Sequence, residues 1–196
     1  MPDEHERLTV RRYRDRDKNA VWRVHDRSLR DSAMCYSPEY NRYLRHIPTA
    51  FLEGDGEFLV ATMSTTGDDR TAGTDDPDSN ARTNGIVGIG GFQPLERSKP
   101  VNSDIRRALD ADVMTAHVRS VAVLPDAQSS GVGTVLTTEL ERRAATRDFS
   151  QAVLSTPVEL TGAHGFYESR GYEVLPMAAE DGDADSDHYW YRKSLV

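Results

Sequence analysis

The chain has almost no cysteine and no long apolar run. Among its 196 residues Cys35 is the only cysteine, so no disulfide can form within the chain, and this usage fits a reducing compartment. No stretch approaches the roughly 18 consecutive apolar residues of a membrane-spanning helix, and the start MPDEHERL is charged, unlike a secretory signal. We therefore expect a cytoplasmic protein with no membrane contact.

Positive charge is also scarce. The 24 Lys and Arg residues are outnumbered by 32 Asp and Glu residues, the net charge is −8, and lysine occurs only at Lys18, Lys99 and Lys193. Nonspecific nucleic-acid binding depends on clustered basic side chains, so no nucleic-acid partner is expected. An acidic excess keeps a protein soluble through self-repulsion, which predicts adaptation to a salt-rich cytoplasm, as in a halophile.

Metal-ligand patterns are missing. The histidines show no paired ligand spacing, and the Asp-rich segment 64–84 lacks the residue order of a calcium loop, so no metal site is predicted. Residues 64–84 and 179–187 are acidic and nearly free of apolar side chains, which predicts flexible surface loops. The length otherwise indicates a single domain over 1–196.

Apolar periodicity outlines the secondary structure. Alternating or continuous apolar runs predict strands at 8–13, 57–63, 85–92, 114–123, 152–155, 172–177 and 189–195. Helical spacing predicts helices around 20–29, 36–51 and 104–109, after residue 133, and at 161–170. In the helix after residue 133, Val132, Val135, Leu136 and Leu140 are expected to form the buried face. This order predicts a mixed sheet with helices on both faces, an α/β or α+β arrangement.

The segment HVRSVAVLPDAQSSGVG, from His117 to Gly133, is the most informative part of the chain. It predicts a strand, a proline stop, and a loop of small residues that opens a helix. We call residues 128–133 the glycine loop. Such a loop exposes backbone N–H groups at the positive end of a helix dipole, where a phosphate or pyrophosphate can bind. Its two glycines allow an anion close to the backbone.

Two familiar anion motifs do not fit the glycine loop. No lysine follows either glycine, as a P-loop requires, and Gly131-Val-Gly133 lacks the third glycine of a dinucleotide fingerprint. The run Val121-Ala-Val-Leu-Pro125 followed by Gln128-Ser-Ser-Gly131-Val-Gly133 instead resembles motif A of the GCN5-related N-acetyltransferases, the GNAT family. Downstream, Gly165-Phe-Tyr-Glu-Ser-Arg-Gly-Tyr172 resembles the segment that closes the same family's cofactor site.

The resemblance implies a mostly antiparallel central sheet of about seven strands and an acetyl-CoA site. It implies that the backbone of Val121, Ala122 and Val123 pairs with the pantetheine arm. It assigns the pyrophosphate to the backbone amides of Gln128, Ser129, Ser130, Gly131, Val132, Gly133 and Thr134. The activity it implies is direct transfer of the acetyl group of acetyl-CoA to a primary amine of an unidentified acceptor. A homodimer formed through the last strand is expected from family habit.

Two catalytic candidates follow from the resemblance. Tyr167 aligns with the family's general acid, and a phenol with a pKa of about 10 is a suitable donor to a thiolate; the alternative is a core aromatic. His117 occupies the place of a glutamate that serves several members as general base, and a histidine suits that role at neutral pH; the alternative is a structural histidine. By the period of two, His117, Arg119, Val121 and Val123 are expected on one strand face.

The sequence also departs from the family pattern. Leu160 stands where members often have an asparagine that bonds the cofactor arm, and Thr161 is the candidate substitute. His164, one turn before Tyr167, is expected to face solvent. The missing asparagine keeps an alternative open, a noncatalytic acyl-CoA-binding or regulatory module on the same fold. A nucleotide-binding protein is a more distant alternative.

Overall fold

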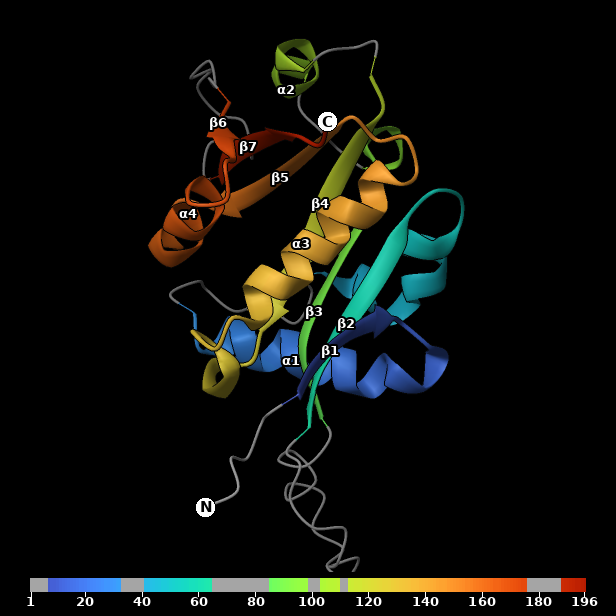
Figure 1. The fold of residues 1–196 in the computed structure, drawn as a ribbon, viewed down its shortest axis with the longest axis vertical. Helices are drawn as coiled ribbons and strands as arrows, with labels where there is room; N and C mark the ends of the chain where they lie inside the picture. Colours follow the sequence, from blue (N-terminus) through green and yellow to red (C-terminus); the bar gives the residue numbers. More distant parts are fainter. Residues whose placement is uncertain (1–6, 33–40, 65–84, 99–102, 110–112, 176–187) are drawn as a thin grey trace, which may run out of the picture.

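The structure is a computed structural model that describes residues 7–32, 41–64, 85–98, 103–109, 113–175 and 188–196 (Figure 1). The strands are β1 (Arg7–Arg12), β2 (Glu57–Ser64), β3 (Gly85–Pro94), β4 (Thr115–Val123), β5 (Gln151–Pro157), β6 (Glu173–Val174) and β7 (His188–Ser194). The α-helices are α1 (Lys18–Arg30), α2 (Ser103–Ala108), α3 (Val132–Ala145) and α4 (Thr161–Glu168). None of the helices in these ranges is long and apolar enough to cross a membrane.

All seven strands form one sheet in the order β1-β2-β3-β4-β5-β7-β6. Every neighbouring pair is antiparallel except β4 and β5, which run parallel. In Figure 1, α3 crosses in front of the sheet and α1 lies behind it. The predicted fold class, a mixed and mostly antiparallel sheet with helices on both faces, is confirmed.

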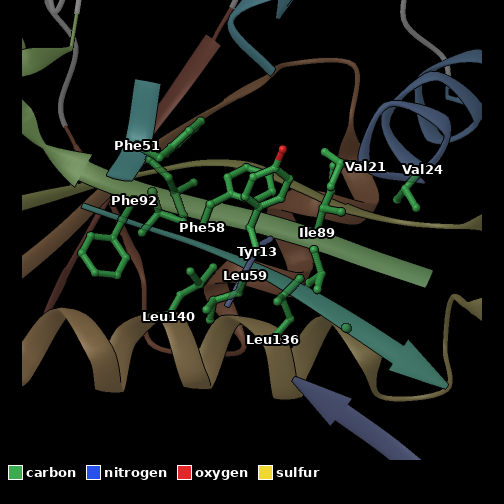
Figure 2. Close-up of a cluster of buried hydrophobic side chains, with 14 of the residues drawn as sticks. Tyr13, Val21, Val24, Phe51, Phe58, Leu59, Ile89, Phe92, Leu136 and Leu140 are labelled. Atoms are coloured by element: carbon green, nitrogen blue, oxygen red, sulfur yellow. The ribbon is translucent and has the colours of Figure 1, made fainter. Parts of the chain in front are cut away.

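The core forms where the apolar faces of α1 and α3 meet the two faces of the sheet. Leu136 and Leu140, one helical turn apart on α3, are fully buried, as are Val21 and Val24 on α1. Figure 2 shows these side chains approaching the sheet from opposite sides. Val135 is 44% exposed, so its predicted place on the buried face of α3 is wrong. The position lies one residue, and therefore about 100°, away from Leu136 around the helix.

The second predicted helix is replaced by two short irregular turns. Within the part of 36–51 that the structure describes, a 3₁₀ turn (η2, Arg42–His46) is followed by a single π-helical turn (η3, Pro48–Leu52). Asn41 takes a left-handed backbone conformation just before η2. Pro48 has no backbone N–H to donate, so an α-helical ladder cannot run through it.

The two predicted acidic loops lie largely outside the described residues. Ser64 is the last residue of β2, whereas residues 65–84 and 179–187 are not described. Of the predicted strand at 172–177, the described part, 172–175, contains β6 over Glu173 and Val174, and residues 176–177 lie outside the described ranges.

Candidate active site

A break in β4 separates that strand from β5. The parallel pairing of the two strands covers only three residue pairs and ends at His117 and Val153. Just beyond, Ser120 adopts a left-handed backbone (φ 57°), and the β3–β4 register shifts between Ile89 and Gly91. An irregularity of this kind bends a strand and increases its twist. Figure 1 shows the two strands diverging from this point.

A cleft of about 730 Å³ occupies the space beside the second half of β4, between that strand and α4. The predicted cofactor-binding residues that line it are Val121, Ala122, Val123, Gln128, Ser129, Gly131, Gly133, Thr134 and Tyr167. Three predicted residues do not line it: Ser130, Val132 and Thr161. The Ser130 hydroxyl donates to the carbonyl oxygen of Ala127 (2.7 Å), and Val132, the first residue of α3, has a buried side chain. A role for these three through their backbone amides stays a prediction.

The glycine loop opens α3 without using the helix's first amides. Gly131 is the N-cap residue, with φ 86° and no side-chain hydrogen bond, and no acidic side chain lies in the first turn. The first intrahelical bond runs from Val135 N to Gly131 O (3.0 Å). The amides before it have no partner within the helix and carry the positive end of its dipole. The cleft therefore ends on a group of donors suited to an anion.

The end of α1 forms another wall of the cleft, which the sequence did not predict. Ser28, Leu29, Asp31 and Ser32 line it. The Ser28 hydroxyl donates to the carbonyl oxygen of Val123 (2.9 Å), and Gln128 Nε2 donates to the same oxygen (3.3 Å). Both lone pairs of the Val123 carbonyl oxygen are thereby engaged, so this oxygen cannot accept a further hydrogen bond from a ligand. Nothing in the helical periodicity of α1 distinguishes Ser28 from an ordinary polar helix residue.

Tyr167 is both a core aromatic residue and a residue of the cleft wall. It is 8% exposed and contacts the rings of Phe166, Tyr172 and Tyr191, with centroids 5.2 to 6.1 Å apart. It also lines the cleft. Burial raises the pKa of its phenol above the ordinary value, with Arg170 opposing the shift. The hydroxyl therefore stays protonated near neutral pH, as a proton donor must before it acts.

His164 fixes α4 against the sheet. Its Nδ1 lies 2.8 Å from the Tyr191 hydroxyl and its Nε2 lies 3.2 Å from the carbonyl oxygen of Val158. Because a carbonyl oxygen only accepts, Nε2 carries the proton and Nδ1 accepts from the tyrosine. The predicted solvent-facing position of His164 is wrong, because both ring nitrogens are hydrogen-bonded and the side chain is half-buried.

His117 is enclosed on the face of the sheet opposite to α3. It is 6% exposed, its Nδ1 lies 2.7 Å from Ser98 Oγ, and its ring lies 5.4 Å from that of Trp190. Gln93 Nε2 donates to the same serine oxygen (2.8 Å). Burial, and to a smaller extent Arg119, lowers the pKa of His117 from 6.5 to about 3. His117 is not among the residues that line the cleft, so its role as general base stays a prediction.

The break at Ser120 also corrects the predicted strand face. Gly90 lies on the side of α3, since a Cβ built on it would meet Leu136, Leu140 and Val121. Val121 therefore faces α3, whereas His117 faces Ser98 and Trp190. The two residues do not share a face, because the irregularity interrupts the period of two between them.

Leu160, in the place of the family's asparagine, lines the cleft with an apolar side chain. Thr161 beside it is exposed at the start of α4 and does not line the cleft. Among the described residues, no three His, Cys, Asp or Glu side chains form a group that could hold a metal ion.

Comparison with known proteins agrees with this architecture. The profile of the acetyltransferase (GNAT) family matches residues 24–172. A GNAT-family acetyltransferase from Staphylococcus aureus Mu50 superposes with a TM-score of 0.68 at 13% identity, covering 97% of this chain and all of the other. No curated protein matches the chain in sequence.

Two similar structures contain the cofactor. PaiA N-acetyltransferase from Thermoplasma acidophilum, in complex with coenzyme A, gives a TM-score of 0.60 at 16% identity and covers 96% and 99% of the two chains. YncA from Salmonella typhimurium, a putative acetyltransferase with acetyl-CoA, gives 0.62 at 17% identity and covers 96% and 94%. At these identities the structures show the fold, and the family profile shows membership: the chain belongs to the GNAT acetyltransferase family.

Proposed function

We propose that this protein transfers the acetyl group of acetyl-CoA directly to a primary amine. The main support is that one cleft is lined both by the start of α3, whose first amides have no partner within the helix, and by the side chain of Tyr167. The donors suit a pyrophosphate and the phenol suits a leaving thiolate. Acetyl-CoA supplies an activated acetyl thioester when bound.

The residues of the chain divide this work. The amides of residues 129–134 hold the anionic end, since the Gln128 amide already donates to the carbonyl oxygen of Pro125 (3.1 Å). The backbone of Val121 and Ala122 holds the arm. The nitrogen–carbon bond to the acetyl group forms while the carbon–sulfur bond breaks. The Tyr167 hydroxyl donates a proton to the departing sulfur, and the proton released by the amine passes to solvent, from which the tyrosine regains its own. Charges and atoms balance without a covalent enzyme intermediate.

A base role for His117 requires one tautomer of its ring. Nδ1 must carry the hydrogen and donate a hydrogen bond to Ser98 Oγ, so that Nε2 is free to accept the proton of the amine. With a pKa of about 3, such a base would give kcat/KM no ascending limb near pH 6.5. An ascending limb of kcat/KM near pH 6.5 that is lost in His117→Gln would mean that His117 titrates far above the pKa of about 3 that its burial gives it.

The first test is a thermal-shift titration with acetyl-CoA, CoA, ATP and NAD, at low and at molar KCl. A ligand at 100 times its Kd adds roughly 2.7 kcal/mol of stability, which is a visible shift. Stabilisation by acetyl-CoA and CoA alone is the expected result. No shift with either CoA compound at both salt levels would contradict the assignment of the cleft. A rise in Tm with KCl alone would support the predicted halophilic adaptation.

A noncatalytic acyl-CoA-binding module is the second candidate, favoured by the apolar Leu160 in the cleft wall. Release of free thiol from acetyl-CoA in the presence of a panel of amines separates the two. Amine-dependent thiol release supports the transferase, and tight CoA binding without turnover supports the module.

A further inference from the structure

Ser120 has an unusual conformation for a residue inside a strand. It is not a glycine, yet its backbone is left-handed (φ 57°), and a Cβ makes that conformation costly in free energy. The other described non-glycine residues with positive φ lie outside the strands; they are Asn41, Ser129 and Asp148. A strained residue of this kind persists only where its surroundings hold it in place. The contacts of Ser120 therefore help to decide the shape of β4.

Ser120 separates two parts of β4 that present different faces. Before it, Arg119 pairs with Gly91, and a Cβ built on Gly91 would meet Phe51. After it, Val121 faces α3. Arg119 and Val121 are two positions apart, so a regular strand would place both side chains on one face. The conformation of Ser120 places them on opposite faces.

Tyr43 contacts β4 at this point, from the face opposite to α3. Its hydroxyl lies 2.9 Å from Ser120 Oγ, and the Cζ of Arg119 lies 4.2 Å from the centre of its ring. The ring of Tyr43 also packs on the buried Phe51, with centroids 5.9 Å apart. Tyr43 is thus held between Phe51 and Arg119, and its hydroxyl is fixed against Ser120.

The residues that follow Ser120 belong to the cleft. Val121, Ala122 and Val123 all line it, whereas the pairing of β4 with β5 has already ended at His117. The direction in which residues 121–123 turn their backbone groups depends on the dihedral angles of the residue before them. A bond that fixes Ser120 therefore also fixes this wall of the cleft.

We infer that Tyr43 is a positioning residue for the cofactor, which holds Ser120 in its left-handed conformation and so turns the backbone of residues 121–123 toward the cleft. This inference rests on the proposed function, which assigns the cleft to acetyl-CoA. Tyr43 does not itself line the cleft, so it acts through Ser120 and not by contact with the ligand.

The experiment measures the Kd of acetyl-CoA by calorimetric titration for wild type, Tyr43→Phe, Ser120→Ala, Ser120→Gly and the double variant Tyr43→Phe/Ser120→Gly. Thermal melts check that each variant is folded at the titration temperature. Tyr13→Phe is the control for loss of a hydroxyl, because its ring packs in the same core, 6.0 Å from that of Phe58, and does not line the cleft. Asp148→Gly is the control for glycine, because Asp148 is also left-handed (φ 65°) and lies off the cleft.

Tyr43→Phe and Ser120→Ala should each bind acetyl-CoA about threefold to tenfold more weakly, because one hydrogen bond no longer favours the binding conformation. Ser120→Gly should bind within about twofold of wild type, because glycine adopts the left-handed conformation without a Cβ to strain it. When glycine is present at 120, Tyr43→Phe should have no further effect on the Kd. Both controls should bind as wild type does.

Wild-type affinity in both Tyr43→Phe and Ser120→Ala would overturn the inference and leave the proposed function standing. Binding by Ser120→Gly as weak as that of Ser120→Ala would do the same. So would an equal effect of Tyr43→Phe with serine and with glycine at 120. A wild-type protein that does not bind acetyl-CoA would overturn the proposed function, and the inference with it.

Discussion

The two halves of β4 differ in what happens to their polar groups. In the half that pairs with β5, Thr115 Oγ1 accepts from Gln151 Nε2 (2.8 Å) and His117 contacts Ser98. In the half beyond Ser120, Val121 and its neighbours face a cleft. The polar side chains of the closed half bond inside the protein, whereas the open half borders the cleft, where only the Val123 carbonyl oxygen is already engaged by Ser28 and Gln128 among the side-chain contacts described.

The difference arises from one irregularity. Where strands stay paired, buried polar side chains must find partners, because an unpaired one costs about 1 to 3 kcal/mol. Where β4 leaves β5, the backbone and the start of α3 border a cleft that can be filled from outside. The comparison teaches that His117 and the part of β4 that lines the cleft are separate regions, although they are adjacent in sequence.

The strongest way to test the open half is Tyr167→Phe. Removal of the hydroxyl should lower kcat about a hundredfold or more, as loss of a general acid does, with little change in the KM for acetyl-CoA. Tyr172→Phe is the control, since its ring lies 5.5 Å from that of Tyr167 but does not line the cleft. Steady-state kinetics of both variants decide; full kcat in Tyr167→Phe would remove the acid role.

The closed half is tested through the pH dependence of stability. The pKa of His117 is lowered from 6.5 to about 3 on folding. Its contribution to the free energy of unfolding is therefore complete above pH 6.5 and is lost as the pH falls from 6.5 toward 3. Wild type should lose about 2 kcal/mol more than His117→Gln between pH 7 and pH 5. Urea unfolding at both pH values measures this. Equal losses in the two proteins would show that His117 is accessible to protons in the folded state.

Gly131→Ala sharpens the comparison at the glycine loop, with Gly171→Ala as its matched control. Both glycines have a left-handed backbone, φ 86° and 81°, and a Cβ on either meets nothing within 4 Å. Each variant should lose about 1 kcal/mol of stability through backbone strain alone. Only Gly131→Ala should also bind acetyl-CoA about tenfold more weakly, by calorimetric titration. Equal binding by the two variants would argue that the loop is only a helix entry.

The smallest expected effect is a gain. Leu160→Asn restores an amide to the cleft wall and should tighten acetyl-CoA binding about threefold, the size of one net hydrogen bond. The same titration measures it, with Leu29→Asn on the α1 side of the cleft as control. Weaker binding in Leu160→Asn would mean that this wall is adapted to apolar contact with the ligand.

Local signals predicted much of the site. The strand before Pro125 and the start of α3 follow from residues that are neighbours in sequence. The same is true of the helix that carries Tyr167. A helix was predicted over 36–51, but its described part is irregular, because apolar spacing alone does not reveal the effect of Asn41 and Pro48.

Contacts between distant residues were not predictable in the same way. Ser28 reaches Val123 across 95 positions, and Tyr43 reaches Ser120 across 77. The enclosure of His117 depends on Ser98 and Trp190, which belong to other elements. No periodicity within one element carries such information.

The sequence by itself determined the family and the glycine-capped start of α3, because motif spacing and the residues of a helix start are properties of a continuous segment. Only the tertiary structure decided which polar groups are used internally and which face the cleft. That division depends on the break at Ser120 and on partners from other strands and helices. It separates His117 from the residues that line the cleft.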